Sequence, residues 1–205
     1  MDEQQERHDP AAQGPGAARG AVAGVDGPPE GPVPTTAELR LMIAAQRALS
    51  QPATVRTAQL MSLAGEHAAV WIAGGALGAL VDRPRRRRWL AATATVVAAH
   101  GSSVVVKRLT RRVRPSHPDV AVRAGTPSRW SLPSSHATST AAAAVAFGAL
   151  VGRGKMAPLV PAMALSRIVV GVHYPSDVAA GSALGALVAL AGQPVAERLL
   201  GERRA

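Results

Sequence analysis

The sequence predicts an all-α integral membrane protein, a helical bundle of five to six transmembrane helices. Two observations carry this prediction: five stretches of the chain lack charge almost entirely, and clusters of arginine separate them. A third is that only five of the 205 residues are aromatic, which is few for a soluble core of this size. A soluble bundle rich in alanine and leucine is the alternative, but its helices would show a polar face that these stretches lack.

Residues 1–34 differ in composition from the rest of the chain. They carry four more acidic than basic side chains, whereas the whole chain has a net charge of +10, so the other residues carry +14. The stretch is rich in Gly, Pro and Ala and has no apolar periodicity, so we expect a disordered acidic tail. It has neither the basic nor the apolar region of a secretory signal, so we expect none. Residues 35–205 are then the membrane domain.

The first ordered element is expected to begin at Thr35, which has capping-box spacing to Glu38. Apolar residues follow at helical intervals, but Arg40, Arg47 and Arg56 interrupt the region. Residues 36–64 therefore predict an amphipathic interfacial helix, a surface helix or a sixth transmembrane helix.

Five apolar stretches follow, and many of their residues are small, which permits close helix contact in lipid. They cover residues 67–81, 89–106, 137–152, 156–172 and 178–196. Several are shorter than the roughly 20 residues that a transmembrane helix prefers, but flanking residues can extend them.

Basic clusters in residues 83–88, 153–155 and 198–204 alternate with these stretches and fall on one side of the membrane. The positive-inside rule makes that side the cytoplasm, so the loops 107–136 and 173–177 share the extracytoplasmic face of the plasma membrane. The cluster in residues 83–88 resembles a nucleic-acid-binding run, but its place between two spans favours a membrane anchor. We therefore expect the bilayer, and no nucleic acid, as a partner.

Three short motifs lie on the predicted extracytoplasmic face. K-x6-R-P (residues 107–115) follows the second stretch, P-S-S-H (133–136) precedes the third, and S-R-x5-H-x3-D (166–177) ends the fourth. Each motif alone is weak evidence, because Arg-Pro can be a turn and Ser-Ser a helix cap. The three together, in this order and on one face, indicate a single site.

The motifs contain the side chains that an anionic phosphate requires. Lys107, Arg114 and Arg167 are three cations, and an arginine inside an apolar stretch should face a polar interior and an anionic partner. Ser134 and the amide of Ser135 precede an apolar helix, where N–H groups favour an anion. The chain has no cysteine and no carboxylate or histidine cluster with metal-ligand spacing. We therefore expect neither a metal nor another cofactor.

The combination resembles the type 2 phosphatidic acid phosphatase (PAP2) superfamily over about residues 60–190. The resemblance implies a PAP2/haloperoxidase-like core and a phosphohistidine mechanism: His173 attacks phosphorus, Asp177 orients its ring, and His136 protonates the leaving oxygen and then activates water. Ser135 replaces the usual glycine of the second motif, which would cost about 1 kcal/mol if that position needed a positive φ.

Within the superfamily, residues 107–140 look most like small actinobacterial members. This implies a metal-independent membrane phosphatase that hydrolyses a lipid-linked phosphate monoester, namely a polyprenyl-phospho-sugar phosphate. Undecaprenyl diphosphate and phosphatidate or phosphatidylglycerophosphate are alternative substrates. A haloperoxidase would be soluble and much larger, and a non-catalytic lipid-binding relative would be expected to have lost motif residues. The oligomeric state is not predicted.

Three further polar residues lie in or beside the predicted spans. Glu66 and His67, at the outer end of the first stretch, are expected to line the substrate mouth or to pack between helices. His100 lies in the middle of the second stretch and outside the motifs, so we expect it to be a structural residue bonded to a neighbour.

Overall fold

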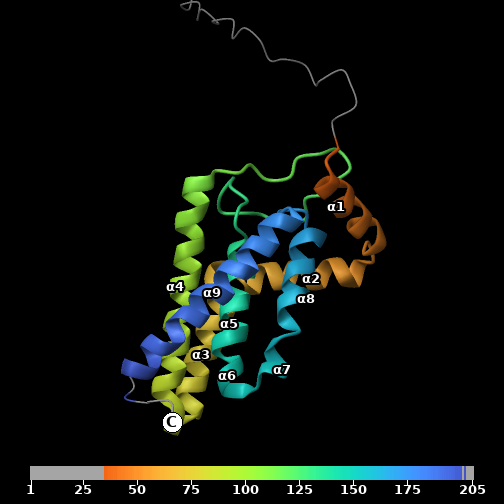
Figure 1. Cartoon of the computed structure of the whole chain (residues 1–205). Coiled ribbons are helices and arrows are strands. Elements are labelled where there is room, and N and C mark those ends of the chain that lie inside the picture. Colours follow the sequence, from red (N-terminus) through yellow and green to blue (C-terminus); the bar gives the residue numbers. More distant parts are fainter. Residues whose placement is uncertain (1–34, 200, 202–205) are drawn as a thin grey trace, which may run out of the picture. The chain divides into compact units, whose positions relative to one another are not determined.

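The computed structural model describes residues 35–199 and 201, so the predicted acidic tail of residues 1–34 lies outside it. All regular elements of the described chain are helical, as predicted (Figure 1). They are α1 (Ala37–Ala48), α2 (Pro52–Ala64), η1 (Glu66–Ala68), α3 (Ala69–Val81), η2 (Arg83–Arg85), α4 (Arg86–Thr110), α5 (Ser135–Ala146), α6 (Gly148–Val151), α7 (Arg153–Met156), α8 (Leu159–Val169) and α9 (Pro175–Leu199). Residues 111–134 connect α4 to α5 without a helix.

Two helices are long and apolar enough to cross a membrane. They comprise residues Arg83–Thr110, which include α4, and Pro175–Ala196 of α9. A third crossing is available if α2 and the η1–α3 segment, which meet at a bend of 57°, count as one broken span. Large apolar side chains point outward from these helices, as lipid-facing residues do; exposed examples are Leu77, Leu80, Leu90, Val97, Leu187 and Leu190. By length and composition the described helices therefore offer two or three spans, fewer than the five to six expected.

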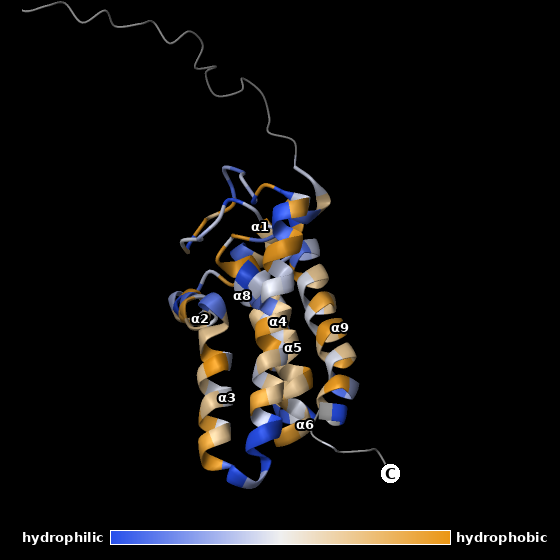
Figure 2. Cartoon of the chain, turned by 90° about the vertical axis from the view of Figure 1, so that its left-hand side faces the viewer, coloured by the Kyte–Doolittle hydropathy of each residue, from blue (hydrophilic) through white to orange (hydrophobic). Residues whose placement is uncertain are grey.

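Residues 36–64 do not form one continuous helix. The chain breaks between α1 and α2, and α2 runs across the direction of α3, α4 and α9 (Figures 1 and 2). The buried face of α1, from Leu39 to Ile43, packs against Val120 and Tyr174. The predicted capping box is wrong by one residue: Thr36 is the N-cap, with its Oγ1 accepting from the Leu39 amide at 3.3 Å.

The core of the bundle depends on small residues where helices meet. Helix α5 packs on α9 and α4, and α3 packs on α4. A Cβ on Gly185 of α9 would collide with the backbone carbonyl of Thr138 in α5, and one on Gly75 of α3 would collide with Thr93 of α4. These glycines let the backbones approach closely, which is how helices associate when lipid replaces water.

The two ends of the bundle differ in chemistry. Figure 2 shows apolar residues along α3, α4 and α9 between polar ends. One end holds η2 and α7, with the arginines predicted to anchor it (Figure 1). The other end holds the start of α9, the end of α4 and the loop 111–134, where the three motifs lie.

Candidate active site

The motif residues gather around one cavity of about 990 Å³ at the end of the bundle that holds the loop 111–134. Six of the eight predicted site residues line it: Lys107, Arg114, Ser135, His136, Arg167 and His173. Ser134 and Asp177 do not line it; both are fully buried and bond to one another, because the Ser134 amide donates to the Asp177 carbonyl at 3.0 Å. The structure thus brings all eight into one neighbourhood.

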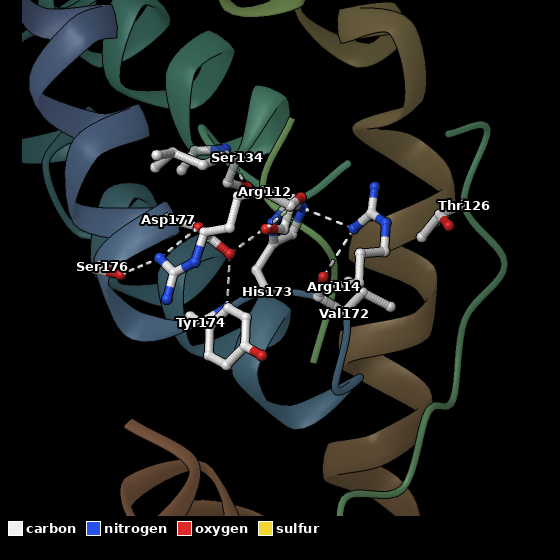
Figure 3. A network of polar contacts seen from close by, with 12 residues as sticks. Arg112, Arg114, Thr126, Ser134, Val172, His173, Tyr174, Ser176 and Asp177 are labelled. Carbon is white, nitrogen blue, oxygen red and sulfur yellow. Dashed lines mark hydrogen bonds and ion pairs between the residues drawn. The ribbon is translucent and has the colours of Figure 1, made fainter. Parts of the chain in front are cut away.

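His173 lies between a carboxylate and a guanidinium (Figure 3). Its Nδ1 faces Oδ2 of Asp177 at 3.6 Å, which is longer than a hydrogen bond, and its Nε2 is 3.3 Å from Nη1 of Arg114. Because a guanidinium only donates, Nε2 is the acceptor and the ring proton belongs on Nδ1, toward the carboxylate. The nitrogen that carries the lone pair is therefore Nε2, on the side of the cations.

The surroundings of His173 keep its ring neutral. Burial lowers the pKa of His173, and together with the charges of Arg114 and Lys107 it brings the value to about 4, although Asp177 opposes the change in part. At neutral pH the ring is therefore unprotonated, as a nucleophile must be. Burial also lowers the pKa of Arg114, to about 10, so this residue is still charged at pH 7.

The three predicted phosphate-binding cations are buried or partly buried. Arg114 donates to the carbonyls of Val172 and Ser128 at 2.7 and 2.9 Å, and Arg167, only 1% exposed, donates to Ser62 Oγ at 3.0 Å. In the part of the chain that the structure describes, no carboxylate forms an ion pair with Lys107, Arg114 or Arg167. Burying a cation without a counterion costs free energy. A bound anion would therefore stabilise this end of the cavity.

His136 is held from α2 at the start of α5. Its Nε2 is 2.8 Å from the Ser62 carbonyl, which can only accept, so Nε2 carries a proton and Nδ1 remains for other partners. Ser62 therefore binds His136 with its carbonyl and Arg167 with its hydroxyl. Gly65 packs on the same ring, since a Cβ there would lie 2.6 Å from Cδ2 of His136.

The serines of the second motif begin α5. Ser134 is its N-cap, with the hydroxyl accepting from the Ala137 amide at 3.5 Å. Ser135 follows as the first helical residue, and the hydroxyl of Ser103 donates to its Oγ at 2.8 Å. Ser135 is not among the residues with positive φ, so the serine that replaces the usual glycine is not strained here.

Asp177 accepts hydrogen bonds from Arg112 and Tyr174, which the sequence did not single out. Arg112 donates to Asp177 Oδ1 at 3.0 Å and to Glu38 Oε2 at 2.6 Å, and its guanidinium lies 4.1 Å from the ring centre of Tyr174. The Tyr174 amide donates to Asp177 Oδ2 at 2.8 Å (Figure 3). In the sequence, Arg112 is one basic residue among several, and Ser62 and Gly65 carry no signal at all.

The polar residues expected at the mouth also line the cavity. Glu66 and His67 do so where the chain leaves α2, and His67 adopts a left-handed conformation with φ 52°. His100 lines the cavity too, and its Nδ1 has no hydrogen-bond partner. The bond from His100 to a neighbour that the sequence predicted is not found at this atom, and one face of α4 from His100 to Lys107 is turned to the cavity.

Within residues 35–199 and 201, no group of three or more His, Cys, Asp or Glu side chains is placed to hold an ion.

Known proteins resemble this chain in sequence and in fold. The sequence model of the PAP2 superfamily matches residues 88–198. Decaprenylphosphoryl-5-phosphoribose phosphatase from Mycolicibacterium smegmatis is 53% identical over 142 residues, 69% of this chain and 79% of that protein. The protein of the same name from Mycobacterium tuberculosis is 51% identical over 152 residues, 74% of this chain and 86% of that one.

Two more distant matches are also named as phosphatases. Lipid A 1-phosphatase from Rhizobium johnstonii is 36% identical over 104 residues, 47% of this chain and 43% of that protein. The crystal structure of a transmembrane PAP2 type phosphatidylglycerolphosphate phosphatase from Bacillus subtilis superimposes with a TM-score of 0.63, covering 80% of this chain and 89% of that one. At 22% identity this last likeness shows the fold alone.

Proposed function

The chain belongs to the PAP2 superfamily and is a membrane phosphatase of that type, and from this premise we propose that it removes the 5-phosphate from decaprenylphosphoryl-5-phosphoribose. The observation that supports this substrate is the identity of more than half over 79–86% of the length of two mycobacterial phosphatases of that name. The cavity supports it as well, because a phosphate monoester fits its cluster of unpaired cations.

We propose the following first step. Lys107, Arg114 and Arg167 bind the phosphate oxygens, and the start of α5 contributes the N–H group of Ser135. Arg114 turns from His173 to the phosphate, which frees Nε2 to attack phosphorus. A P–N bond forms as the bond to the sugar oxygen breaks, and the positive charge that develops on the ring is stabilised by Asp177 at Nδ1.

His136 supplies and recovers the proton in this proposal. With Nε2–H bound to the Ser62 carbonyl, the proton that moves is on Nδ1 of the imidazolium. A bound phosphate dianion favours that charged form. His136 gives this proton to the departing sugar oxygen, then takes one from a water that attacks the phosphohistidine. Inorganic phosphate leaves and both rings return to their starting states.

We also propose the membrane arrangement. The bundle crosses with α3, α4, α5–α6, α7–α8 and α9, the shorter ones extended by flanking residues. The basic end at η2 and α7 faces the cytoplasm, so the active site opens on the extracytoplasmic face. The chain lacks cysteine, so a cysteine placed at exposed Ser116 should react with an impermeant thiol reagent in intact cells. One at Arg86 should react only after permeabilisation, and the reverse pattern would contradict the orientation.

Phosphate release from purified protein in detergent tests the substrate. We expect kcat/KM for decaprenylphosphoryl-5-phosphoribose to exceed that for phosphatidate, phosphatidylglycerophosphate and undecaprenyl diphosphate by about tenfold or more, a difference of about 1.4 kcal/mol in transition-state binding. His173→Ala is the inactive control. A higher kcat/KM for any of the other three lipids would contradict the assignment.

A further inference from the structure

The cavity contains a cation that the three motifs do not include. We propose that Arg123 forms a second anion subsite, which binds the phosphodiester that joins the sugar to the lipid. The inference deepens the proposed function, because it says how the site recognises a substrate with a second phosphate one sugar away from the scissile monoester.

Arg123 is fixed in place but has no acidic partner. Its amide donates to the Val170 carbonyl, its carbonyl accepts from Gln59 Nε2, and its Nη1 donates to the Val169 carbonyl, each at 2.9 Å. Among the described residues no carboxylate forms an ion pair with it, and no protein acceptor is bound by its Nε or Nη2. A half-buried guanidinium with donors to spare, on the wall of a cavity, is suited to a phosphate.

Helix α2 indicates where the backbone of Arg123 lies relative to the catalytic residues. Gln59, which donates to the backbone carbonyl of Arg123, and Ser62, which binds His136 and Arg167, both line the cavity. Three residues of helix advance about 4.5 Å along its axis. The two positions on α2 are thus slightly less than one helical turn apart, a rise comparable with the size of one sugar.

One charge on either side of these two positions gives the substrate a direction. Glu66 lines the cavity just after the end of α2, beyond Ser62, whereas the backbone of Arg123 is bonded by Gln59, before Ser62. A phosphodiester would be repelled by the first and attracted by the second. We therefore place the sugar between Ser62 and Gln59, with the lipid phosphate on Arg123 and the monoester on the catalytic cations.

Comparison of two substrates in one enzyme tests the subsite. Decaprenylphosphoryl-5-phosphoribose carries both a monoester and a diester, whereas p-nitrophenyl phosphate carries the monoester alone. In Arg123→Gln the ratio of kcat/KM for the lipid to kcat/KM for p-nitrophenyl phosphate should fall about ten- to hundredfold, through the KM of the lipid, as expected for one charge-assisted hydrogen bond. Arg123→Lys should recover part of the ratio.

Arg40→Gln is the matched control. It removes one arginine from the exposed surface of α1, away from the cavity lining, and should leave the ratio as in the wild type. An unchanged ratio in Arg123→Gln overturns the subsite, and so does an equal loss on both substrates, which would reflect a disturbed loop.

Phosphatidylglycerophosphate separates this inference from the proposed function, because it also carries a diester near its monoester. If the wild type prefers this lipid, the proposed substrate is wrong. The subsite is nevertheless supported if Arg123→Gln then weakens turnover of phosphatidylglycerophosphate relative to phosphatidate, which carries one phosphate, and it is overturned if the two fall together.

Discussion

Gly65 offers a direct test of the part assigned to His136, because its substitution reaches the ring without removing it. In Gly65→Ala the new Cβ would lie 2.6 Å from Cδ2 and 3.3 Å from Nε2 of His136. Carbon atoms in contact prefer about 3.5–4.0 Å, so the ring must retreat by about 1 Å. The backbone itself tolerates alanine, since Gly65 has φ −84° and ψ −3°.

That displacement sets the expected magnitude. A retreat of about 1 Å lengthens the bond of 2.8 Å between Nε2 and the Ser62 carbonyl beyond hydrogen-bonding range and moves Nδ1 from the leaving oxygen. Misplacement of a catalytic group on this scale costs about a hundredfold in rate. We therefore expect kcat on decaprenylphosphoryl-5-phosphoribose to fall about a hundredfold in Gly65→Ala.

The assay compares two leaving groups and two glycines. A sugar alcohol departs badly without a proton, whereas p-nitrophenolate departs well, so the loss should be larger on the lipid than in the burst from p-nitrophenyl phosphate. Gly74→Ala is the control, because a Cβ there has no neighbour within 4 Å. Wild-type kcat on the lipid in a folded Gly65→Ala protein would refute the assigned position of His136.

Further predictions concern the same machinery. His136→Ala should lose two to four orders of magnitude on the lipid but still give a burst of p-nitrophenolate, and His173→Ala should give none; the opposite pattern would exchange their roles. Arg112→Gln frees Asp177 from its donor at 3.0 Å and should lower kcat about tenfold or more with KM unchanged, so a rise in KM alone would contradict it. Unfolded His173 binds a proton near pH 6.5 but the folded one only near pH 4, so this residue should reduce stability by about 3 kcal/mol as the pH decreases between these values; thermal unfolding of His173→Gln should show a smaller loss over this range than the wild type. Turnover should survive EDTA and be inhibited by vanadate, and loss in EDTA with recovery in magnesium would refute metal independence.

The charged and catalytic residues of the site could be predicted from the sequence, because their spacing places them at those ends of the apolar stretches that share one membrane face. Lys107, His136 and His173 follow or precede such stretches, and the fold brings them to one cavity. Residues that matter only through a tertiary contact could not be predicted. Gly65 matters only because α5 passes beside it, and a contact between residues 71 positions apart leaves no trace in local periodicity.

The membrane spans show a similar limit. Hydropathy identified the apolar stretches, and α4 and α9 satisfy the requirements for length and composition. Helix α8 has 11 residues. Residues 36–64 form two helices where one was possible: α1 packs against Val120 and Tyr174, and Pro52 begins α2 after a turn of three residues. Hydropathy measures the solvent that a stretch prefers and is blind to such packing.

The bend of 57° between α2 and the η1–α3 segment has an electrostatic consequence. Because α2 ends at Ala64, Ser62 lies in its last turn, where carbonyls have no amide four residues on to bind and the helix has its negative pole. That pole points at His136 through the Ser62 carbonyl and favours the ring when it is charged. In a continuous helix through residues 52–81 the same oxygen would accept from the amide of Glu66. The break thus places about half a negative charge, from the end of α2, beside His136, the general acid. It does so without a carboxylate, which would repel the phosphate.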